Sequence, residues 1–300
     1  MGASVLYSEN LRAHSEAIEA ALPGFLPELC ADYQPVPEAM RYACEAGGKR
    51  LRPVLVMELC RLCGGDPKAA LPFACALEMI HSYSLVHDDL PCMDNSPLRR
   101  GKPSVHAAFG ETMALLAGDA LLNRAFEVAL SPAARANVEA EKAAAAAFEL
   151  ADAAGIHGMI GGQVMDLRCE GQTIDMDTLV TLQAGKTAAL IKAACRMGVL
   201  LAGGSAEELE AATVFGFELG LAFQIVDDIL DVTSTPEVLG KPTGSDAENE
   251  KTTYVSLLGL DGASQLAKTR TETALAALDT FGEKAEDLRQ LATWLLTRAV

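Results

Sequence analysis

Apolar residues recur at helical spacing along nearly the whole chain, and this periodicity constrains the fold more than any other feature. Runs of alternating β-branched residues, the pattern typical of strands, are absent. Several periodic segments exceed twenty residues and are joined by short connections, which favours an all-α bundle of long antiparallel helices. Helices are predicted over residues 8–22, 36–46, 53–64, 67–90, 111–130, 133–155, 175–202, 205–231, 246–259, 262–280 and 283–298.

The breaks between these helices are local, and no change of composition marks a domain boundary. Glycine pairs at 47–48, 64–65 and 203–204 and loops at 91–110 and 236–244 separate the periodic segments. Half of the 300 residues are hydrophobic, which suffices for a sizeable core. We therefore expect residues 1–300 to form a single domain.

Charge and hydropathy exclude several classes of protein. The formal net charge is −17, so the phosphates of a nucleic acid would be repelled and no nucleic-acid partner is expected. The longest apolar stretch, 69–86, contains Pro72, Glu78 and His81, which predicts a buried helix and no membrane span. The first ten residues lack the basic start and apolar body of a signal peptide, so a cytoplasmic location is expected.

Two clusters of aspartates lie at the ends of two long apolar helices. The first contains Asp88, Asp89 and Asp94, and the second contains Asp227, Asp228 and Asp231. The spacing of the second cluster places Asp227 and Asp231 on one helical face, one turn apart. Three carboxylates this close repel one another unless a hard cation lies among them, and oxygen-only ligands suit Mg²⁺. Each cluster is therefore predicted to bind Mg²⁺.

The first cluster needs a distorted helix end. Asp94 follows Asp88 by six residues, about 240° round an ideal helix, so the two side chains would point in different directions. Pro91 disfavours helix at Leu90 and removes an amide donor. We therefore predict that the helix ends or kinks there, that Asp94 returns beside Asp88, and that the two acidic clusters face each other across the mouth of the bundle.

Basic residues lie near the acidic clusters in a chain that is otherwise acidic. The stretch GGKRLRP (47–53) places three cations at a predicted helix start, which is itself an anion site. The basic residues are Lys49, Arg50, Arg52, Arg99, Arg100, Lys102, Lys186, Lys241 and Lys251. Mg²⁺ held by carboxylates usually completes its shell with substrate phosphates. The arrangement predicts a site for two pyrophosphate groups, one bridged through Mg²⁺ and one held directly by Lys and Arg, above an apolar interior that accepts a hydrocarbon tail.

The order and spacing of these motifs resemble the trans-isoprenyl diphosphate synthases, and specifically the bacterial-type farnesyl diphosphate synthases. The matching stretches are GGKRLRP (47–53), EMIHSYSLVHDDLPCMDNSPLRRGKPSVH (78–106), GGQVMDL (161–167), LQAGKTAALIKAA (182–194), GLAFQIVDDILDVT (220–233) and LGKPTGSDAENEKTTY (239–254). The chain departs from the family at Ser96-Pro97, where acidic residues are common, so that loop is expected to move differently.

The resemblance implies an isoprenoid synthase-type fold around a central apolar cavity, usually a homodimer, with three Mg²⁺ ions per active site. It implies that isopentenyl diphosphate condenses head-to-tail with allylic diphosphates, dimethylallyl and geranyl, to give farnesyl diphosphate and pyrophosphate. The reaction would proceed by Mg²⁺-assisted ionisation to an allylic carbocation, which the apolar interior would shield from water.

The resemblance also implies roles for individual residues. Asp88, Asp94 and Asp227 look like the principal Mg²⁺ ligands, supported by Asp89, Asp228 and Asp231. Lys49, Arg52, His81 and Arg100 look like the isopentenyl diphosphate site. Arg99, Lys186, Lys241 and Lys251 look like partners of the allylic diphosphate, and Thr187 and Gln224 resemble polar residues near the allylic carbon. The residues expected to act in catalysis are Asp88, Asp89, Lys186, Thr187, Gln224 and Asp227.

Product length is expected to depend on the depth of the cavity. Tyr83 lies five residues before Asp88, roughly 7–8 Å deeper along the helix, where its ring could form a floor. Ser84 is smaller and lies one turn below Asp88. In the family, an aromatic residue at the Tyr83 position together with a first aspartate motif that is two residues longer resembles the fifteen-carbon producers, so farnesyl diphosphate is expected. Geranylgeranyl and geranyl diphosphate synthases are the alternatives within the family.

Three other classes of protein fit the sequence less well. A di-iron helical bundle needs two Glu-x-x-His motifs, and the chain has only Glu78-x-x-His81. A class I terpene cyclase does not need a second pyrophosphate site. GGKRLRP and His81 indicate such a site in this chain, which argues against a cyclase. A non-catalytic partner subunit would be expected to lose aspartates, and all six are present.

Overall fold

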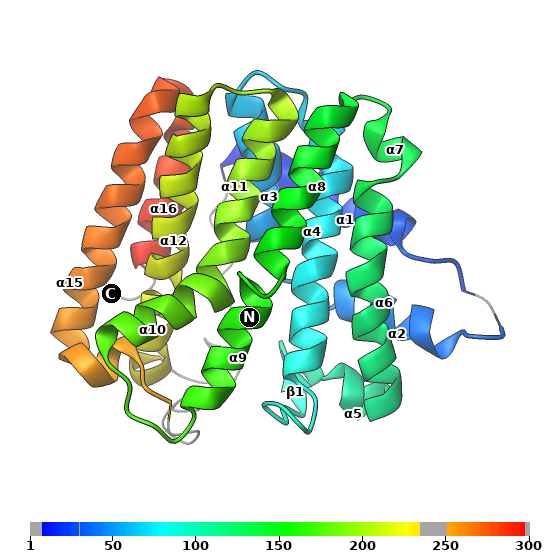
Figure 1. Cartoon of the computed structure of the whole chain (residues 1–300), viewed down its shortest axis with the longest axis horizontal. Helices are drawn as coiled ribbons and strands as arrows, with labels where there is room; N and C mark the ends of the chain where they lie inside the picture. Colours follow the sequence, from blue (N-terminus) through cyan, green and yellow to red (C-terminus); the bar gives the residue numbers. More distant parts are fainter. Residues whose placement is uncertain (1–7, 30, 235–250, 298–300) are drawn as a thin grey trace.

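The computed structural model describes residues 8–29, 31–234 and 251–297, and it confirms the all-α fold (Figure 1). The helices before the first acidic cluster are α1 (Glu9–Phe25), α2 (Pro35–Cys44), α3 (Leu51–Leu62) and α4 (Pro67–Asp88). The next are α5 (Val105–Phe109), α6 (Glu111–Ala129), α7 (Pro132–Arg135), α8 (Ala140–Ala154) and α9 (Met159–Cys169). The last are α10 (Met176–Gln183), α11 (Ala189–Ala202), α12 (Ala206–Thr233), α15 (Tyr254–Ala277) and α16 (Glu286–Thr297).

Three short elements interrupt this pattern. A π-helix, η1 (Ala184–Ala188), joins α10 to α11, and a 3₁₀ segment, η2 (Leu278–Ala285), precedes α16. Strands β1 (Leu98–Arg99) and β2 (Lys102–Pro103) form an antiparallel hairpin in which Leu98 pairs with Pro103. Within the described ranges this hairpin is the only sheet.

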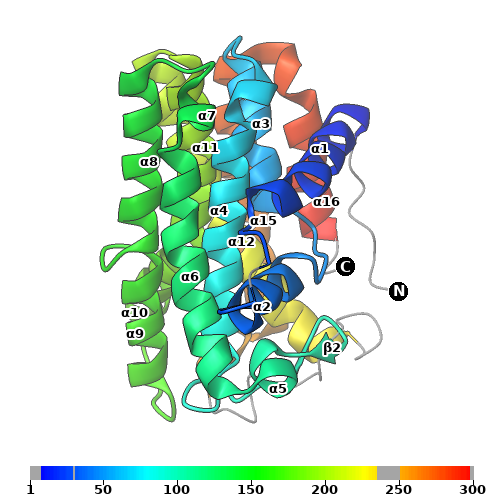
Figure 2. The same ribbon diagram turned by 90° about the vertical axis from the view of Figure 1, so that its right-hand side faces the viewer.

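The central helices are buried because they are apolar on nearly every side. Ten of the twelve residues of α3 are buried, and the packed neighbours of this helix include α4 and α11. α12 packs between α11 and α15. In Figures 1 and 2, α4 and α12 run in the same direction and both end in the lower half of the molecule. The two acidic clusters therefore belong to the same end of the bundle.

Local capping sets where the two long helices begin. Pro67 occupies the first turn of α4, and the side chain of Asp66 accepts a hydrogen bond from the Lys68 amide at 2.9 Å. α12 begins with a capping box, in which Ser205 accepts from the Glu208 amide and the Glu208 carboxylate accepts from the Ser205 amide.

The structure refines or changes the sequence prediction in several places, among them the π-helix η1 inside the predicted helix 175–202 and the helix α5 inside the predicted loop 91–110. The segment 133–155 is two helices, α7 and α8, because Glu139 is extended and begins a new helix. α9 was not predicted, because its glycines weaken the helical pattern. The predicted break between helices 246–259 and 262–280 is present as a kink inside α15 at Gly259, which has a positive φ of 70°; residues 246–250 lie outside the described residues.

Two helices, Pro67–Asp88 and Ala206–Thr233, are long and apolar enough to cross a membrane by length and composition. However, 72% and 61% of their most apolar windows are buried inside the structure. The core helices of soluble proteins have the same properties, so these two helices are weak support for a membrane span.

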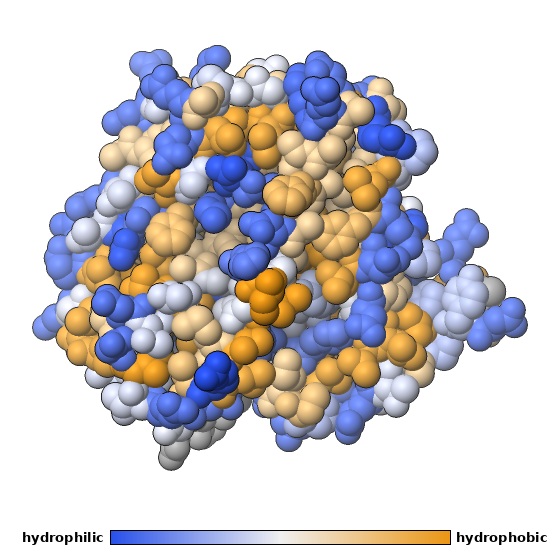
Figure 3. Space-filling model, viewed as in Figure 1, coloured by the Kyte–Doolittle hydropathy of each residue, from blue (hydrophilic) through white to orange (hydrophobic). Residues whose placement is uncertain are grey.

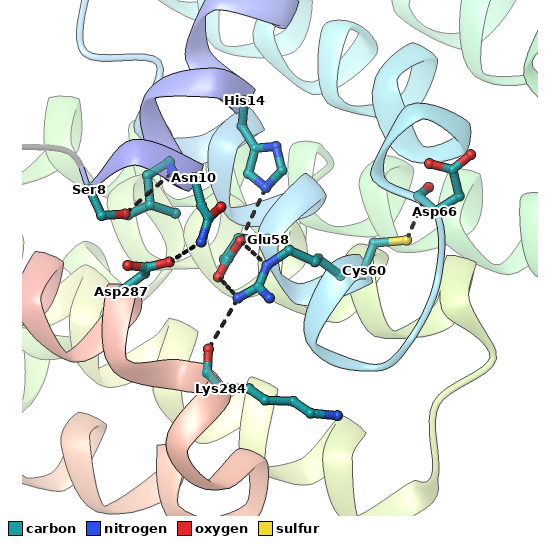
Figure 4. Close-up of polar contacts among 10 residues, drawn as sticks. Ser8, Asn10, His14, Glu58, Cys60, Asp66, Lys284 and Asp287 are labelled. Atoms are coloured by element: carbon teal, nitrogen blue, oxygen red, sulfur yellow. Dashed lines mark hydrogen bonds and ion pairs between the residues drawn. The ribbon is translucent and has the colours of Figure 1, made fainter.

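A buried polar cluster ties α1 and the C-terminal segment to α3 (Figure 4). Glu58 is fully buried, accepts hydrogen bonds from Arg61 at 2.6 and 2.9 Å, and lies 3.1 Å from His14 of α1. Burial alone would raise the pKa of Glu58, but these partners hold it below its ordinary value. Arg61 also donates to the Lys284 carbonyl at 3.1 Å. The cluster holds three segments that are distant in sequence.

Candidate active site

The first acidic cluster forms where α4 ends, as predicted. The amide of Asp94 donates to the carbonyl of Asp88 at 2.9 Å, so the chain turns back onto the helix end. The amide of Asn95 donates to the Leu90 carbonyl at 3.0 Å, and Asn95 has a left-handed backbone with φ 49°. The turn contains Pro91 and brings Asp94 beside Asp88, which an ideal helix would not do.

Burial makes this cluster unfavourable for negative charge. It raises the pKa of Asp88 to about 6, with Lys186 opposing the shift and Asp94 adding to it. Asp89 is 2% exposed, and burial also raises its pKa. Arg99 of the hairpin opposes that shift by donating to both carboxylate oxygens of Asp89, at distances of 2.5 to 3.1 Å. A bound cation would offset the remaining repulsion.

Two lysines approach the first cluster from other elements. Lys186, in the π-helix η1, donates to the carboxylate of Asp166 in α9 at 2.5 Å. Lys251 donates to the same carboxylate at 3.1 Å and lies 3.6 Å from Asp94. π-helical turns inside α-helices are frequent at functional sites. Sequence reasoning gave no role to Asp166, although it lies in the GGQVMDL stretch that carried the family resemblance.

The second acidic cluster is held by hydrogen bonds within and beyond α12. Asp228 accepts from the Gln224 side chain and from the amide of Tyr254 in α15, each at 2.9 Å. The hydroxyl of Thr187 donates to Gln224 at 3.1 Å. Asp228 and Asp231 are 3% and 2% exposed. Because Thr187 follows Lys186 in η1, this chain of contacts links the second cluster to the lysine beside Asp88.

Within residues 8–29, 31–234 and 251–297, no three acidic side chains are grouped closely enough to hold a metal ion as they stand. In this arrangement Asp89 pairs with Arg99 and Asp228 with Gln224. The oxygen donors of Asp88, Asp94 and Asp227, at one end of the bundle, nevertheless fit the ligand chemistry of Mg²⁺. Burial makes the charged form of Asp88 unfavourable, and a cation bound beside it would stabilise that charge.

Cations surround His81 in α4. Burial is the main cause that holds the pKa of His81 well below its ordinary value, and Arg52, Arg100, Arg99 and Arg50 add to the shift. The Nε atom of Arg52 is buried and has no hydrogen-bond partner in the described part of the chain. Burial lowers the pKa of Arg52, while Glu78 and Asp227 oppose that shift. The surroundings of His81 are therefore strongly positive, and the Arg52 Nε is a buried donor there.

Two other residues of GGKRLRP have partners on neighbouring elements. Arg50 is 3% exposed, has a left-handed backbone, and pairs with Glu19 at 2.6 Å and Glu78 at 2.5 Å, so it stabilises the start of α3. The Lys49 ammonium lies 5.7 Å from the ring centre of Phe223 and 6.0 Å from that of Trp294. Lys241 lies outside the described residues.

The predicted chain-length residues lie on different sides of α4. Tyr83 is 5% exposed, its ring packs edge-to-face on His87 at 5.8 Å, and its hydroxyl has no partner in the described part of the chain. His87 in turn contacts the Leu115 carbonyl of α6 at 3.0 Å. Ser84 donates to the carbonyl of His81 at 2.9 Å. The Tyr83 ring is thus packed toward α6, whereas Ser84 lies one turn below Asp88.

A small pocket of about 30 Å³ lies beside the first cluster, between α2, α4 and the hairpin. Its lining includes Tyr42, Leu85, Asp89, Arg99 and Arg100. Arg100 has a left-handed backbone with φ 54° and donates to the Gly47 carbonyl, which joins the hairpin to the start of α3.

Comparisons with known proteins agree with this geometry. The polyprenyl synthetase family model matches residues 34–293. The chain is 46% identical over 263 residues to a chloroplastic geranylgeranyl pyrophosphate synthase of Capsicum annuum, which covers 87% of this chain and 71% of the relative. It is 44% identical over 290 residues to geranylgeranyl pyrophosphate synthase 9 of Arabidopsis thaliana, covering 95% of this chain and 79% of the relative.

Solved structures give the same result. An FPP/GFPP synthase from Zymomonas mobilis superposes with a TM-score of 0.85 at 37% identity, covering 95% of this chain and 97% of that one. A geranyltransferase from Helicobacter pylori, complexed with magnesium and isoprenyl diphosphate, superposes with a TM-score of 0.83 at 34% identity, covering 97% and 98%. The chain therefore belongs to the polyprenyl synthetase family and is a prenyltransferase.

Proposed function

We propose that the chain joins isopentenyl diphosphate head-to-tail to an allylic diphosphate and releases pyrophosphate. The observation that carries this proposal is the buried Nε of Arg52, which has no partner within the described ranges and lies among other cations around His81. A buried donor that stays unpaired is costly, and a diphosphate oxygen would satisfy it. The acidic clusters at the same end of the bundle supply a second, metal-dependent site for the other diphosphate.

The leaving group departs only if its developing charge is neutralised. Mg²⁺ held by Asp88, Asp94 and Asp227, three ions in all by family resemblance, would supply much of that positive charge, and the magnesium in the Helicobacter pylori structure supports this choice of metal. Lys186, Lys251 and Arg99 add fixed cations beside the first cluster. The hydroxyl of Thr187 and the amide of Gln224 would orient dipoles toward the allylic cation. The proton lost after coupling would leave with the pyrophosphate.

The proposal is tested with purified protein, Mg²⁺, isopentenyl diphosphate and dimethylallyl diphosphate. Pyrophosphate release and a prenyl product are expected. Asp88→Ala and Asp227→Ala are expected to lower turnover by orders of magnitude while the circular dichroism spectrum stays that of a helical protein. Asp177→Ala, an exposed carboxylate in the first turn of α10, is the matched control and should keep full activity. Near-normal turnover in either site variant would contradict the proposal.

For product length we propose geranylgeranyl diphosphate, in place of the farnesyl diphosphate expected from Tyr83. The names of the plant relatives support this choice. So does the packing of the Tyr83 ring against His87 and toward α6, which leaves the small Ser84 one turn below Asp88. Farnesyl diphosphate remains the second candidate, because an aromatic ring that is 5% exposed on the same helix can still limit the depth of the cavity.

Chromatography of the products separates these two candidates. If Ser84 borders the tail, the wild type makes the twenty-carbon product and Ser84→Phe shortens it. If the Tyr83 ring is the floor, the wild type makes the fifteen-carbon product and Tyr83→Ala lengthens it. Tyr83→Phe is the matched control in both cases, because the Tyr83 hydroxyl has no partner in the described residues and its loss should not change product length.

We also propose that the chain forms a homodimer. Large apolar side chains are exposed on the face crossed by α6, α8 and α9, and Figure 3 shows apolar surface there. They are Leu115, Leu116, Phe148, Ile156, Ile160 and Val164, and Phe148 is 72% exposed. Such surfaces commonly mark protein interfaces. Light scattering should give twice the mass of one chain, and Phe148→Glu should shift it toward one chain.

A further inference from the structure

One carboxylate outside the two aspartate clusters faces two of the lysines of the site. Asp166 of α9 is 8% exposed, and one of its oxygens, Oδ2, lies 2.5 Å from the Lys186 ammonium and 3.1 Å from that of Lys251. Burial would raise the pKa of Asp166, but the two lysines hold it below its ordinary value. Asp166 is therefore a buried anion shared by two cations from different elements.

The backbone around Asp166 keeps this contact in place. α9 approaches the π-helix so closely that a Cβ added to Gly162 would lie 2.0 Å from the Lys186 amide nitrogen. Gly185 lies at the same crossing, where an added Cβ would be 3.0 Å from Gly162. The closeness of the two backbones lets a short Asp side chain reach the Lys186 ammonium one helical turn beyond Gly162.

Besides Asp166, other carboxylates lie near Lys186 and Lys251. Lys251 is 3.6 Å from Asp94 and 3.6 Å from Glu170, and Lys186 is close enough to Asp88 to lower its pKa. Without Asp166, both ammonium groups would pair with Asp88 and Asp94. A divalent ion would then have to displace them from these carboxylates.

We propose that Asp166 is a positioning residue that competes with Asp88 and Asp94 for Lys186 and Lys251, so that the two ammonium groups bind these carboxylates less tightly, the carboxylates stay available to a metal ion, and both ammonium groups stand ready for a diphosphate. This inference rests on the proposed function and extends it to a residue for which sequence reasoning gave no role. Asp166 need not touch either substrate, since its effect passes through the two lysines.

The test replaces Asp166 by Asn, which keeps the shape of the side chain and removes its charge. Binding of inorganic pyrophosphate in the presence of Mg²⁺, measured by calorimetry, should weaken by about tenfold or more, as expected when a buried charge-assisted hydrogen bond is lost. KM for the allylic diphosphate should rise likewise, while KM for isopentenyl diphosphate should stay within about twofold. The matched control is Glu170→Gln, which removes an exposed partner of Lys251 and should change pyrophosphate binding by less than about twofold.

A double-mutant cycle makes the test specific. If Asp166 acts through the lysines, Asp166→Asn should weaken pyrophosphate binding less in a Lys251→Met background than in the wild type. Wild-type pyrophosphate binding in Asp166→Asn would overturn the inference, as would equal losses for both substrates together with a lower melting temperature. A wild-type protein that binds pyrophosphate but forms no prenyl product would reject the proposed function alone, because the role of Asp166 is scored by binding.

Discussion

Asp88→Asn should stabilise the metal-free protein at neutral pH, although it should abolish prenyl transfer. Burial raises the pKa of Asp88 to about 6, above the ordinary value of 3.8. The native state therefore holds the Asp88 proton more tightly than the unfolded chain does. The contribution of the Asp88 proton to the free energy of unfolding is fully present below about pH 4. It is lost as the pH rises from about 4 through 6.

The size of the effect follows from the shift. A pKa difference of about 2 units corresponds to roughly 3 kcal/mol of native-state stability lost between pH 3 and pH 8. Of this, about 1.4 kcal/mol is lost between pH 5 and pH 8, where the protein is convenient to handle. The amide introduced by Asp88→Asn does not titrate, so the stability of the variant minus that of the wild type should grow by about this amount over the same range.

The assay is urea unfolding followed by circular dichroism, with a chelator present, at pH 5 and pH 8. Other titrating groups are common to both proteins and cancel in the difference. Adding Mg²⁺ at pH 8 should then stabilise the wild type and leave Asp88→Asn nearly unchanged, because a ligand that binds the native state stabilises it. A difference in stability that does not change between pH 5 and pH 8 would refute the argument that burial of Asp88 is costly.

Three further predictions concern other parts of the fold. Glu78→Gln breaks a buried pair with Arg50 and should cost about 3–5 kcal/mol in urea unfolding, and a cost below about 1 kcal/mol would contradict its burial. Gly162→Ala should lower turnover strongly and the melting temperature only slightly, because the added Cβ pushes on the Lys186 backbone. Unchanged turnover would show that the two helices can separate freely. Ser205→Ala removes a cap at the far end of α12 and should cost about 1 kcal/mol with KM unchanged.

The sequence predicts the bundle well because long apolar helices show a clear helical spacing of their apolar residues. It also predicts the turn at Asp94, since Pro91 leaves the helix no way to continue. The family resemblance assigned Arg52, and not Arg50, to the isopentenyl diphosphate site, but the sequence alone gave Arg50 no partner. Arg50 is committed to Glu19 and Glu78, and only the packing of α1 against α3 and α4 shows this.

Other features depend on contacts between segments that are far apart in the chain. Asp166 and Lys251 are separated by 85 residues, and a single sequence gives no sign that they meet. The direction of the Tyr83 ring depends on His87, which fits against α6 because residue 118 is a glycine. α9 escaped prediction because the glycines that allow its close approach to η1 are the residues that lower helix propensity.

The five-residue π-turn Ala184–Ala188 places one surplus residue within an otherwise continuous rod that runs from Met176 to Ala202. Deleting a single residue from this turn would restore ordinary winding and rotate α10 by about 100° relative to α11. Lys186 and Thr187 would then lose their alignment with Asp166 and Gln224, although no side chain had been altered. This part of the gene should therefore tolerate no change in its length, independently of which residues it encodes.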